Sequence, residues 1–462
     1  MRILFVIHDF LPRHRAGSEL YTYYLAQELA QQHTVAIFYV EFDPTSPNNK
    51  LNRKKYLDLV CFEYLRRSYP DEFEKFFLSS QMRLVFENVL HVFQPDVVHF
   101  QHLLNHSFDY PELLKTRGIP SLFTLHDYFL SCASWKGGQR IDQDGRICHE
   151  VDFQHCMSCL TLSRNDVLVP SALPRSIRLA ARIYHIVSFL VPEKVRQSLS
   201  VWVRKFATPG EHGGSEITLS DMKRRHEMVQ SIYRNVDLFI APSRFLQNIF
   251  IAHGIPEDKI IYTDYGFDLS RFSPPKTVGT SWHQIRIGFI GTPVFHKGVH
   301  ILVEAYEKAA LKDCCLTIYG DTGIFPIYSA SLKEMSQDST VIYAGPFENS
   351  KIARILSTVD VLVVPSLWFE NSPLTIHEAF QAGVPVITSD LGGMAELVQE
   401  GINGLLFRVG DVNDLADKIR LFARDADFRQ KLARGARNTK VKSIQENARE
   451  MEELYESLLR KE

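Results

Sequence analysis

Short apolar runs alternate with longer amphipathic stretches along almost the whole chain. The apolar runs are rich in Val, Ile, Leu and Phe, which is typical of strands buried on both faces of a parallel sheet. The stretches between them have helical spacing, and this alternation predicts an α/β fold with parallel sheets. Strands are predicted at 3–7, 35–39, 97–100, 121–125, 238–241 and 259–262, and then at 286–290, 316–319, 341–344, 361–364, 386–388 and 404–407.

The two halves of this pattern predict two successive Rossmann-like units. Between them, 272–284 is rich in turn-forming residues and lacks periodicity, so it is the predicted linker. With 462 residues, the chain is longer than a single core supports. We therefore expect a first domain at 1–271, a second at 285–426 and a charged helical segment at 427–462.

One segment, at about 130–235, interrupts the alternation, and we interpret it as an insertion in the first domain. It begins with a cysteine-rich part, and its later part, 173–205, places basic residues among aromatic and aliphatic ones at helical spacing. That pattern suits a helix that lies on an anionic membrane surface. Helical hairpins packed on the sheet would give the same pattern.

Composition and charge narrow the range of functions. The chain is 45% hydrophobic and 23% charged, as in ordinary soluble domains, and a net charge of -2 gives no general attraction to nucleic acid. No apolar run approaches ~20 residues, and a strand pattern begins at residue 2, which leaves no room for a signal peptide. The seven cysteines are an odd number and partly clustered, which favours reduced thiols or metal ligands. We therefore expect a cytoplasmic protein.

The most informative run is ENSPLTIHEAFQAGVPVI, which starts at Glu370 and follows an apolar strand pattern. Pro373 precedes a helical pattern that begins near Leu374 or Thr375, so the first N–H groups of this helix point at a place suited to a phosphate. The carboxylates of Glu370 and Glu378 lie on either side of the loop and can accept hydrogen bonds from sugar and ribose hydroxyls.

Residues 365–406 resemble the donor-binding signature of the retaining glycosyltransferases of family 4, which have the GT-B fold. The resemblance continues in order through EAFQAGVPVITS, GGMAEL and NGLLF. It implies two Rossmann-like domains that face a central cleft, with the final helical segment returning to the first domain. It also implies that Glu370 binds the donor sugar and that Glu378 binds the ribose. Three further residues complete the expected donor site: Ser372, Leu374 and Thr375.

The activity implied by this resemblance is retaining transfer of a sugar from a nucleotide-diphosphate sugar to a glycan or lipid-linked acceptor. Two alternatives stay open. One is a sugar-nucleotide epimerase or hydrolase of the same fold, although no acid/base pair for it stands out in the sequence. The other is a non-catalytic nucleotide-sugar-binding protein. If the basic segment 173–205 docks on a membrane, the protein is peripheral on the inner membrane face and a lipid-linked acceptor gains support.

The run GTPVFHKGVH, from Gly291, follows another predicted strand. It resembles the family loop in which a Lys before a Gly binds the diphosphate, which implies that role for Lys297. Stabilising the charge on a leaving group is usually the largest contribution of a site of this kind. The family places an Arg directly after the first Gly, whereas this chain has Thr292. Either Lys297 acts with helix dipoles alone, or His296 or Arg244 supplies the charge.

In the first domain, His126 lies just past the carboxyl end of a predicted strand, where sites in open α/β sheets lie. It resembles the histidine of the family that donates to or orients the transferred sugar.

The loop HDFLPRHRAGSE resembles the family's glycine-rich loop, reduced here to Ala16 and Gly17, so close backbone approach to the diphosphate is expected at Gly17. It lacks the G-x-G-x-x-G pattern of dinucleotide binders, which argues against a dehydrogenase. Phe347 is expected to border the nucleotide base.

The triplet from Asp142 to Asp144 spells the D-x-D motif that other glycosyltransferases use for Mn or Mg. Because Gly145 follows and β-like runs flank it, a hairpin turn explains the triplet better. We therefore expect no cofactor for the chemistry.

Four cysteines cluster in the insertion and include a C-x-x-C pair, which suits tetrahedral thiolate ligation of a structural zinc. They are Cys132, Cys148, Cys156 and Cys159. His149 and His155 are substitute ligands. An iron–sulfur cluster and four free or buried thiols are the alternatives. Four thiolates would leave no open position on the metal, so the site would be structural.

Overall fold

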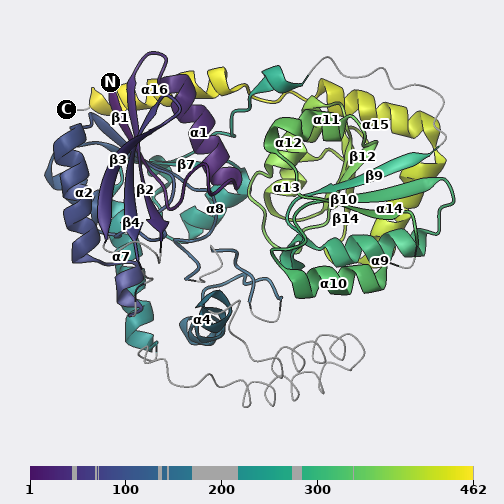
Figure 1. The fold of residues 1–462 in the computed structure, drawn as a ribbon, viewed down its shortest axis with the longest axis horizontal. Helices are drawn as coiled ribbons and strands as arrows, with labels where there is room; N and C mark the ends of the chain where they lie inside the picture. The colour runs from purple at the N-terminus through teal and green to yellow at the C-terminus, as the bar shows by residue number, and fades with distance from the viewer. Residues whose placement is uncertain are drawn as a thin grey trace.

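The protein, described here by a computed structural model, has two α/β domains that lie side by side (Figure 1). The structure describes residues 1–43, 49–67, 70, 72–133, 138–142, 145–168, 217–272, 284–336 and 338–460. Within these residues the first domain is built on an eight-stranded sheet and the second on a six-stranded sheet. The expected pair of Rossmann-like domains is confirmed.

In the sheet of the first domain the strands lie in the order β3-β4-β2-β1-β5-β6-β7-β8. All neighbouring strands pair in parallel except β3 and β4, which are antiparallel. The strands are β1 (Arg2–Val6), β2 (Thr34–Phe42), β3 (Lys50–Tyr56), β4 (Leu59–Arg66), β5 (Val97–Phe100), β6 (Ser121–Thr124), β7 (Leu238–Ala241) and β8 (Ile260–Tyr262).

The hairpin of β3 and β4 was not anticipated from the sequence. β3 reads KLNRKKY and lies at the edge of the sheet, where its residues are half-buried or exposed. Lysine-rich edge strands are common because charge on the edge opposes pairing with another chain. Such a strand carries no long apolar run, so hydrophobic patterning alone does not identify it.

The sheet of the second domain is entirely parallel, with the strand order β11-β10-β9-β12-β13-β14. Its strands coincide closely with the apolar runs of the sequence, and β12 and β13 are buried along their whole length. They are β9 (Ile285–Ile290), β10 (Cys314–Tyr319), β11 (Val341–Gly345), β12 (Val361–Val364), β13 (Val386–Ser389) and β14 (Gly404–Phe407).

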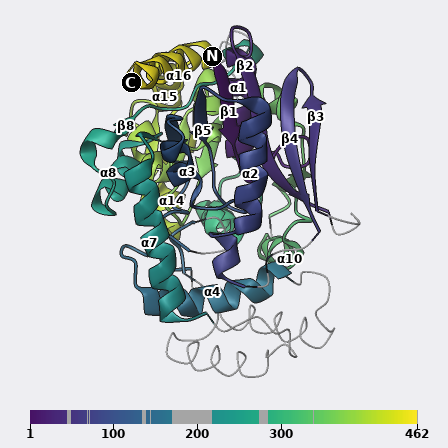
Figure 2. The same cartoon turned by 90° about the vertical axis from the view of Figure 1, so that its left-hand side faces the viewer.

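Helices cover both faces of each sheet. In the first domain α1 (Gly17–Leu29) lies on one face, and α2 (Ser80–Phe93), α3 (Tyr110–Thr116) and α7 (Leu219–Asn235) lie on the other (Figure 2). Successive residues of β1 accordingly enter different cores: Leu4 and Val6 pack on the side of α2, whereas Ile3 and Phe5 pack on the side of α1. This alternation is the two-residue period of a strand.

Helices follow the strands of the second domain along the chain. They are α9 (Val299–Ala309), α10 (Pro326–Met335), α11 (Ile352–Leu356), α12 (Leu374–Gln381), α13 (Gly392–Leu397) and α14 (Val412–Arg424), and α14 is followed by α15 (Ala426–Asn438). The last helix of the chain is α16 (Ile444–Leu459).

The expected insertion at about 130–235 includes a helix that belongs to the regular fold. α7 packs on α3 and provides the crossover between the parallel strands β6 and β7, a connection that requires a helix of this kind. The additional structure is therefore the part before 217, with the helix α4 (Phe153–Leu168) packed against α7 at the base of the molecule (Figure 2).

The C-terminal segment expected at 427–462 divides between the domains. α15 packs against α12 and α14 in the second domain, whereas α16 packs against α1 in the first. Hydrogen bonds fix this return: Tyr21 Oη donates to Asn447 Oδ1 at 2.9 Å, and Tyr455 Oη lies 2.7 Å from His99 Nδ1. α16 is visible in yellow beside α1 in Figure 1.

The basic segment 173–205 lies outside the described residues, so its membrane contact stays a prediction. Among the helices that the structure does describe, none combines the length and the apolar character needed to cross a bilayer.

We expect Met451→Ala to destabilise the first domain. Met451 is fully buried between α16 and this domain, so its truncation should lower the free energy of unfolding by about 2–5 kcal/mol. The measurement is denaturant unfolding followed by circular dichroism. Glu453→Ala, an exposed site on the same helix, is the matched control and should change stability by less than about 0.5 kcal/mol. Equal stability of the two variants would contradict the docking of α16.

Candidate functional site

The carboxyl ends of β9 and β12 bring Lys297 and Glu370 together. Strand order reverses between these two strands, so the loops that follow them part to opposite sides of the sheet and leave a crevice. A 3₁₀ turn, Phe295–Lys297, ends at Gly298, which has φ +68°. A Cβ at Gly298 would collide with the carbonyl oxygen of Pro365, so glycine allows the β9 loop to lie directly on the β12 loop.

Glu370 is the centre of a buried ion pair. Its Oε1 accepts hydrogen bonds from Lys297 Nζ at 2.5 Å, Ser366 Oγ at 2.8 Å and Trp368 Nε1 at 2.9 Å. Burial alone would raise the pKa of Glu370, but the charge and hydrogen bond of Lys297, with the Ser366 bond, outweigh burial and lower it. The carboxylate is therefore ionised and its Oε1 is saturated with donors.

His296, and not Arg244, lies beside this pair. The His296 ring packs edge-on against Trp368 at 5.6 Å, and its charge contributes to lowering the Glu370 pKa. The Arg244 guanidinium instead stacks over the Tyr262 ring in the first domain, at 4.6 Å. Of the two residues considered for the charge missing at Thr292, His296 has the closer position.

Two helix N-termini face each other across the domains. Gly17 begins α1 and Leu374 begins α12, and a Cβ on Gly17 would lie 3.4 Å from Leu374 Cδ1. Neither helix has a side-chain hydrogen bond at its N-cap, where Ala16 and Pro373 stand. The first N–H groups of both helices are therefore without a side-chain cap, and the positive ends of two helix dipoles converge at this place.

Two residues that follow Glu370 bind the first domain. Asn371 Nδ2 donates to the carbonyl of Leu125 at 3.0 Å, and its Oδ1 accepts from Ser243 Oγ at 2.8 Å. Ser372 Oγ donates to Asp264 Oδ1 at 2.7 Å and lies 2.8 Å from His377 Nε2. The Ser372 hydroxyl, expected at the donor, is thus engaged in a contact between the domains.

The other expected donor residues lie on or near α12. Thr375 and Glu378 are half-buried in its first two turns. Phe347 follows β11, is half-buried, and packs against the same apolar cluster as Leu374.

His126 follows β6 and is held at both ring nitrogens. Nε2 lies 2.8 Å from Gln101 Oε1, and Nδ1 lies 2.7 Å from Tyr265 Oη. Burial holds the pKa of His126 well below its ordinary value, so the ring is neutral. The buried Gln101 Nε2 beside it has no hydrogen-bond partner in the described chain.

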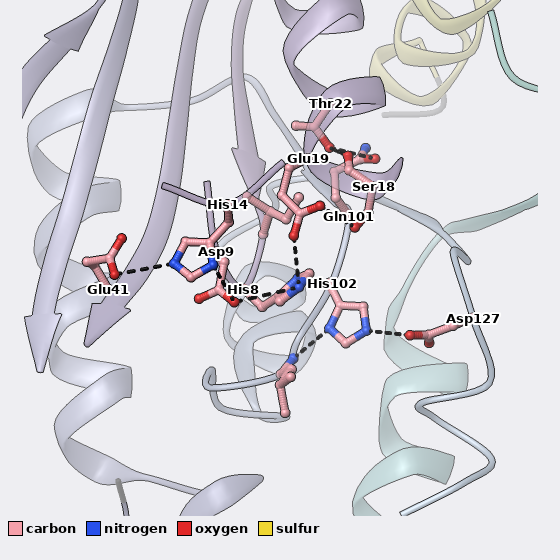
Figure 3. A network of polar contacts seen from close by, with 12 residues as sticks. His8, Asp9, His14, Ser18, Glu19, Thr22, Glu41, Gln101, His102 and Asp127 are labelled. Carbon is pink, nitrogen blue, oxygen red and sulfur yellow. Dashed lines mark hydrogen bonds and ion pairs between the residues drawn. The ribbon is translucent and has the colours of Figure 1, made fainter. Parts of the chain in front are cut away.

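A cluster of acids and imidazoles at the carboxyl edge of the first sheet was missed from the sequence (Figure 3). Its pairs include His8 Nε2 with Glu19 at 3.3 Å, His102 Nε2 with Asp127 at 3.1 Å, and His14 Nε2 with Glu41 at 3.3 Å. We refer to seven residues as the acid–imidazole cluster: His8, Asp9, His14, Glu19, Glu41, His102 and Asp127. The available signal was the His-Asp pair directly after the first strand.

Opposed effects set the charge of the His8–Glu19 pair. Burial lowers the pKa of His8, but the hydrogen bond and charge of Glu19, with the charges of Asp9 and Asp127, raise it above 6.5 overall. Burial likewise raises the pKa of Glu19, but His8 outweighs burial and lowers it to about 2. Both shifts favour a buried imidazolium–carboxylate pair.

The cysteine-rich segment forms a hairpin followed by α4. Ile141 and Ile147 make an antiparallel bridge, and Asp142 Oδ1 accepts from the backbone N–H of Arg146 at 2.8 Å. This confirms the hairpin that was preferred over a D-x-D metal site, although Asp144 lies outside the described residues. No group of three or more His, Cys, Asp or Glu side chains stands in metal-binding geometry in the part of the chain that the structure describes.

Two protein-family models match the chain. Residues 284–425 match glycosyl transferases group 1, and residues 15–153 match glycosyltransferase family 4. Among curated relatives, the amylovoran biosynthesis glycosyltransferase AmsK of Erwinia amylovora is 26% identical over 232 residues, which cover 46% of this chain and 56% of that protein. The chain thus spans about half the length of the curated relatives it matches.

Solved structures resemble the whole chain. Sucrose-phosphate synthase from Thermosynechococcus elongatus has a TM-score of 0.67 at 16% identity and covers 100% of both chains. Anabaena HepE in complex with UDP and glucose has a TM-score of 0.62 at 15% identity and covers 98% of this chain and 99% of that one. At such identities the likeness establishes the fold, which is GT-B.

The His8–Glu19 pair should make stability depend on pH. Because the folded-state pKa of His8 is raised, its contribution is complete below 6.5 and is lost as pH rises through the raised value. Glu19 contributes fully above 4.5, and its contribution is lost as pH falls toward about 2. Glu19→Gln should therefore cost about 1.5–3 kcal/mol at about pH 5.5 and less at about pH 9.

The measurement is a double-mutant cycle of Glu19→Gln and His8→Gln, with urea unfolding at both pH values. The coupling energy should shrink at the higher pH. Asp9 and Asp127 retain part of the effect on His8 in the Glu19 variant, so the cycle isolates the pair. A coupling energy equal at both pH values would contradict the charged state.

Proposed function

Because this chain belongs to the glycosyltransferases of group 1 and family 4 and has their GT-B fold, we propose that it is a retaining glycosyltransferase. It moves a sugar from a nucleotide-diphosphate donor to a glycan or a lipid-linked acceptor. The observation that carries the proposal is that three positive groups lie at the facing edges of the two sheets: the ammonium of Lys297 and the uncapped N-termini of α1 and α12. These two edges also carry Glu370, in the second domain, and His126, in the first.

The donor is proposed to lie between the carboxyl ends of the two sheets. Its diphosphate binds the N-terminus of α12, with close backbone approach at Gly17, and Glu378 accepts from the ribose. In the described chain all hydrogen bonds to Glu370 fall on Oε1, which leaves Oε2 to accept from a hydroxyl of the donor sugar. The complex of HepE with UDP and glucose supports a donor of this class.

The chemistry is proposed to follow the front face of the sugar. The bond from the anomeric carbon to the diphosphate oxygen breaks as the acceptor oxygen bonds to the same face, and the acceptor proton passes to the leaving phosphate. Lys297 stabilises the charge that develops on the diphosphate. Neutral His126, held by Gln101 and Tyr265, orients the sugar.

The acceptor is proposed to bind on the first domain beside the acid–imidazole cluster. Carboxylates there can accept hydrogen bonds from hydroxyl groups, and imidazole N–H groups can donate to them, as glycan recognition requires. The similarity to AmsK, a glycosyltransferase of amylovoran biosynthesis, supports a glycan product. A lipid-linked acceptor would place the protein on the cytoplasmic membrane face, through the basic segment 173–205.

The first test is isothermal titration with UDP and GDP, followed by product analysis with candidate donors and acceptors. A transferase binds one nucleotide and forms product only with an acceptor present. Donor breakdown without an acceptor would instead indicate an epimerase or hydrolase. Binding with no turnover of any donor would indicate a non-catalytic binding protein, for which Thr292 and Ala16 are the sequence arguments.

Lys297→Ala should lower kcat about 10²-fold, the scale for the loss of one transition-state stabiliser. The matched control is Lys308→Ala, an exposed lysine on α9 of the same domain, which should retain full activity. The measurement is steady-state turnover at saturating donor, with the thermal midpoint of each variant recorded. Near-normal turnover of the Lys297 variant would remove its catalytic role.

Glu378→Ala should weaken nucleotide affinity, because the ribose loses a hydrogen bond to a charged group, worth about 1.5–3 kcal/mol or roughly 10- to 100-fold in Kd. Titration calorimetry measures the change. Glu304→Ala, an exposed glutamate on α9, is the matched control and should bind nucleotide as the unmodified protein does. Unchanged affinity of Glu378→Ala would exclude the ribose contact.

A further inference from the structure

The four clustered cysteines line one small cavity in the first domain. Its volume is about 30 Å³, and Arg140 and His155 are also part of its lining. All four cysteines are half-buried: Cys132, Cys148, Cys156 and Cys159. A cavity of this volume holds about one water molecule or one ion.

Three separate segments deliver these thiols. Cys132 lies in the turn after β6, where its N–H bonds to the carbonyl of Tyr128. Cys148 ends the hairpin, and its N–H bonds to the carbonyl of Arg140 at 2.8 Å. Cys156 and Cys159 lie three positions apart in α4, so they share one face of the helix. The fold thus gathers thiols that are distant along the chain.

Two buried arginines flank the cavity without acidic partners. Arg140 is 4% exposed and bonds to the carbonyls of Cys148 and His149, whereas Arg225 is 6% exposed and bonds to the carbonyl of Phe129. Neither guanidinium forms an ion pair with a carboxylate among the described residues. Arg225 lies close enough to Cys132 to interact with it electrostatically. Because a buried unpaired charge is costly, this place favours an anionic group nearby.

We propose that Cys132, Cys148, Cys156 and Cys159 bind one Zn²⁺ as four thiolates. The thiols rotate into the cavity they line, four S–H bonds are lost, four Zn–S bonds form, and four protons are released to solvent. The resulting centre carries a double negative charge, which the guanidinium groups of Arg140 and Arg225 balance. The volume of the cavity suits a single ion and not an iron–sulfur cluster.

The position of this centre gives it a role beyond local stability. The hairpin it secures touches the donor loop of the other domain: Gly145 packs on the ring of Phe295, and Gln139 Nε2 lies 3.3 Å from His296 Nε2. His149, next to Cys148, packs edge-on against Phe369 at 5.8 Å. Zinc therefore fixes the hairpin against the turn that carries Lys297. The zinc site itself is independent of the proposed function. The effect of zinc on nucleotide binding, through this contact of the hairpin with the turn, rests on the proposed function.

The test is the metal content of the purified full-length chain, prepared in reducing buffer without chelators and measured by inductively coupled plasma mass spectrometry. We expect one zinc per chain and no iron. Cys132→Ser and Cys159→Ser should each lose the zinc. Cys315→Ser, a half-buried cysteine of β10, is the matched control and should retain one zinc per chain.

A spectroscopic readout keeps the test independent of variant folding. Replacement of the zinc by Co²⁺ in the unmodified chain should give the ligand-field bands and sulfur-to-metal charge-transfer bands of a tetrahedral thiolate centre. Loss of these bands in Cys148→Ser is expected. A chain without zinc or iron after incubation with Zn²⁺, with all seven cysteines reactive toward a thiol reagent under denaturing conditions, would overturn the proposal. Iron in place of zinc would overturn the choice of metal.

The coupling to the donor loop has its own measurement. Removal of zinc by a chelator should weaken UDP or GDP binding about 10-fold, the scale on which supporting contacts act on a site. Re-addition of Zn²⁺ should restore binding. Unchanged nucleotide affinity in the zinc-free chain would refute the coupling between zinc and the donor loop, but not the zinc site. Absence of nucleotide binding in the zinc-loaded chain would count against the proposed function instead.

Discussion

In each sheet the strand order reverses at one point, and the loops that leave the two strands there part to opposite faces. In the second domain this point lies between β9 and β12, and in the first it lies between β1 and β5. Parallel strands end together at one edge, so each reversal leaves a crevice at the carboxyl edge of its sheet. The contact of Gly17 with Leu374 shows that these two edges face each other. The site is a consequence of that arrangement.

The segment from Glu370 to Ser372 contributes both to the candidate site and to the contact between the domains. Glu370 binds the lysine of the neighbouring loop, Asn371 bonds to the end of β6 in the first domain, and Ser372 bonds to Asp264. A further contact also joins the domains: Glu396 accepts hydrogen bonds from the first N–H groups of α8 (Arg244–Ala252). A ligand that displaces Lys297 from Glu370 would therefore act on a segment that also sets the distance between the domains.

Much of the fold could be predicted from the sequence because buried parallel strands leave continuous apolar runs, and β12 and β13 are the clearest cases. The edge strand β3 carries no such run, and α7 was assigned to the insertion because crossover helices are recognised only once the flanking strands are paired. The pairing of Lys297 with Glu370 follows from strand order, and apolar runs alone do not encode strand order. The resemblance to a family supplied that information.

In the first domain, contacts between side chains that are distant in the sequence also could not be predicted from local patterns. The acid–imidazole cluster draws on the loop after β1, on α1, on β2 and on the loops after β5 and β6, so its members are far apart in the sequence. The cysteines could be grouped from their spacing, whereas the buried arginines beside them could not, because neither Arg140 nor Arg225 has a sequence signal of burial. Likewise, the hydroxyl of Ser372 was assigned to the donor because its contact with the other domain leaves no trace in the local pattern.

In the proposed site a diphosphate is held between Lys297 and the N-termini of α12 and α1. A crystal structure of the full chain with UDP or GDP, whichever binds, is the most direct test. Phosphate density is expected within hydrogen-bonding distance of Lys297 Nζ and of the first N–H groups of α12, with Lys297 drawn away from Glu370. A nucleotide bound elsewhere, or one bound with the Lys297–Glu370 pair unchanged and no phosphate near α12, would contradict this arrangement.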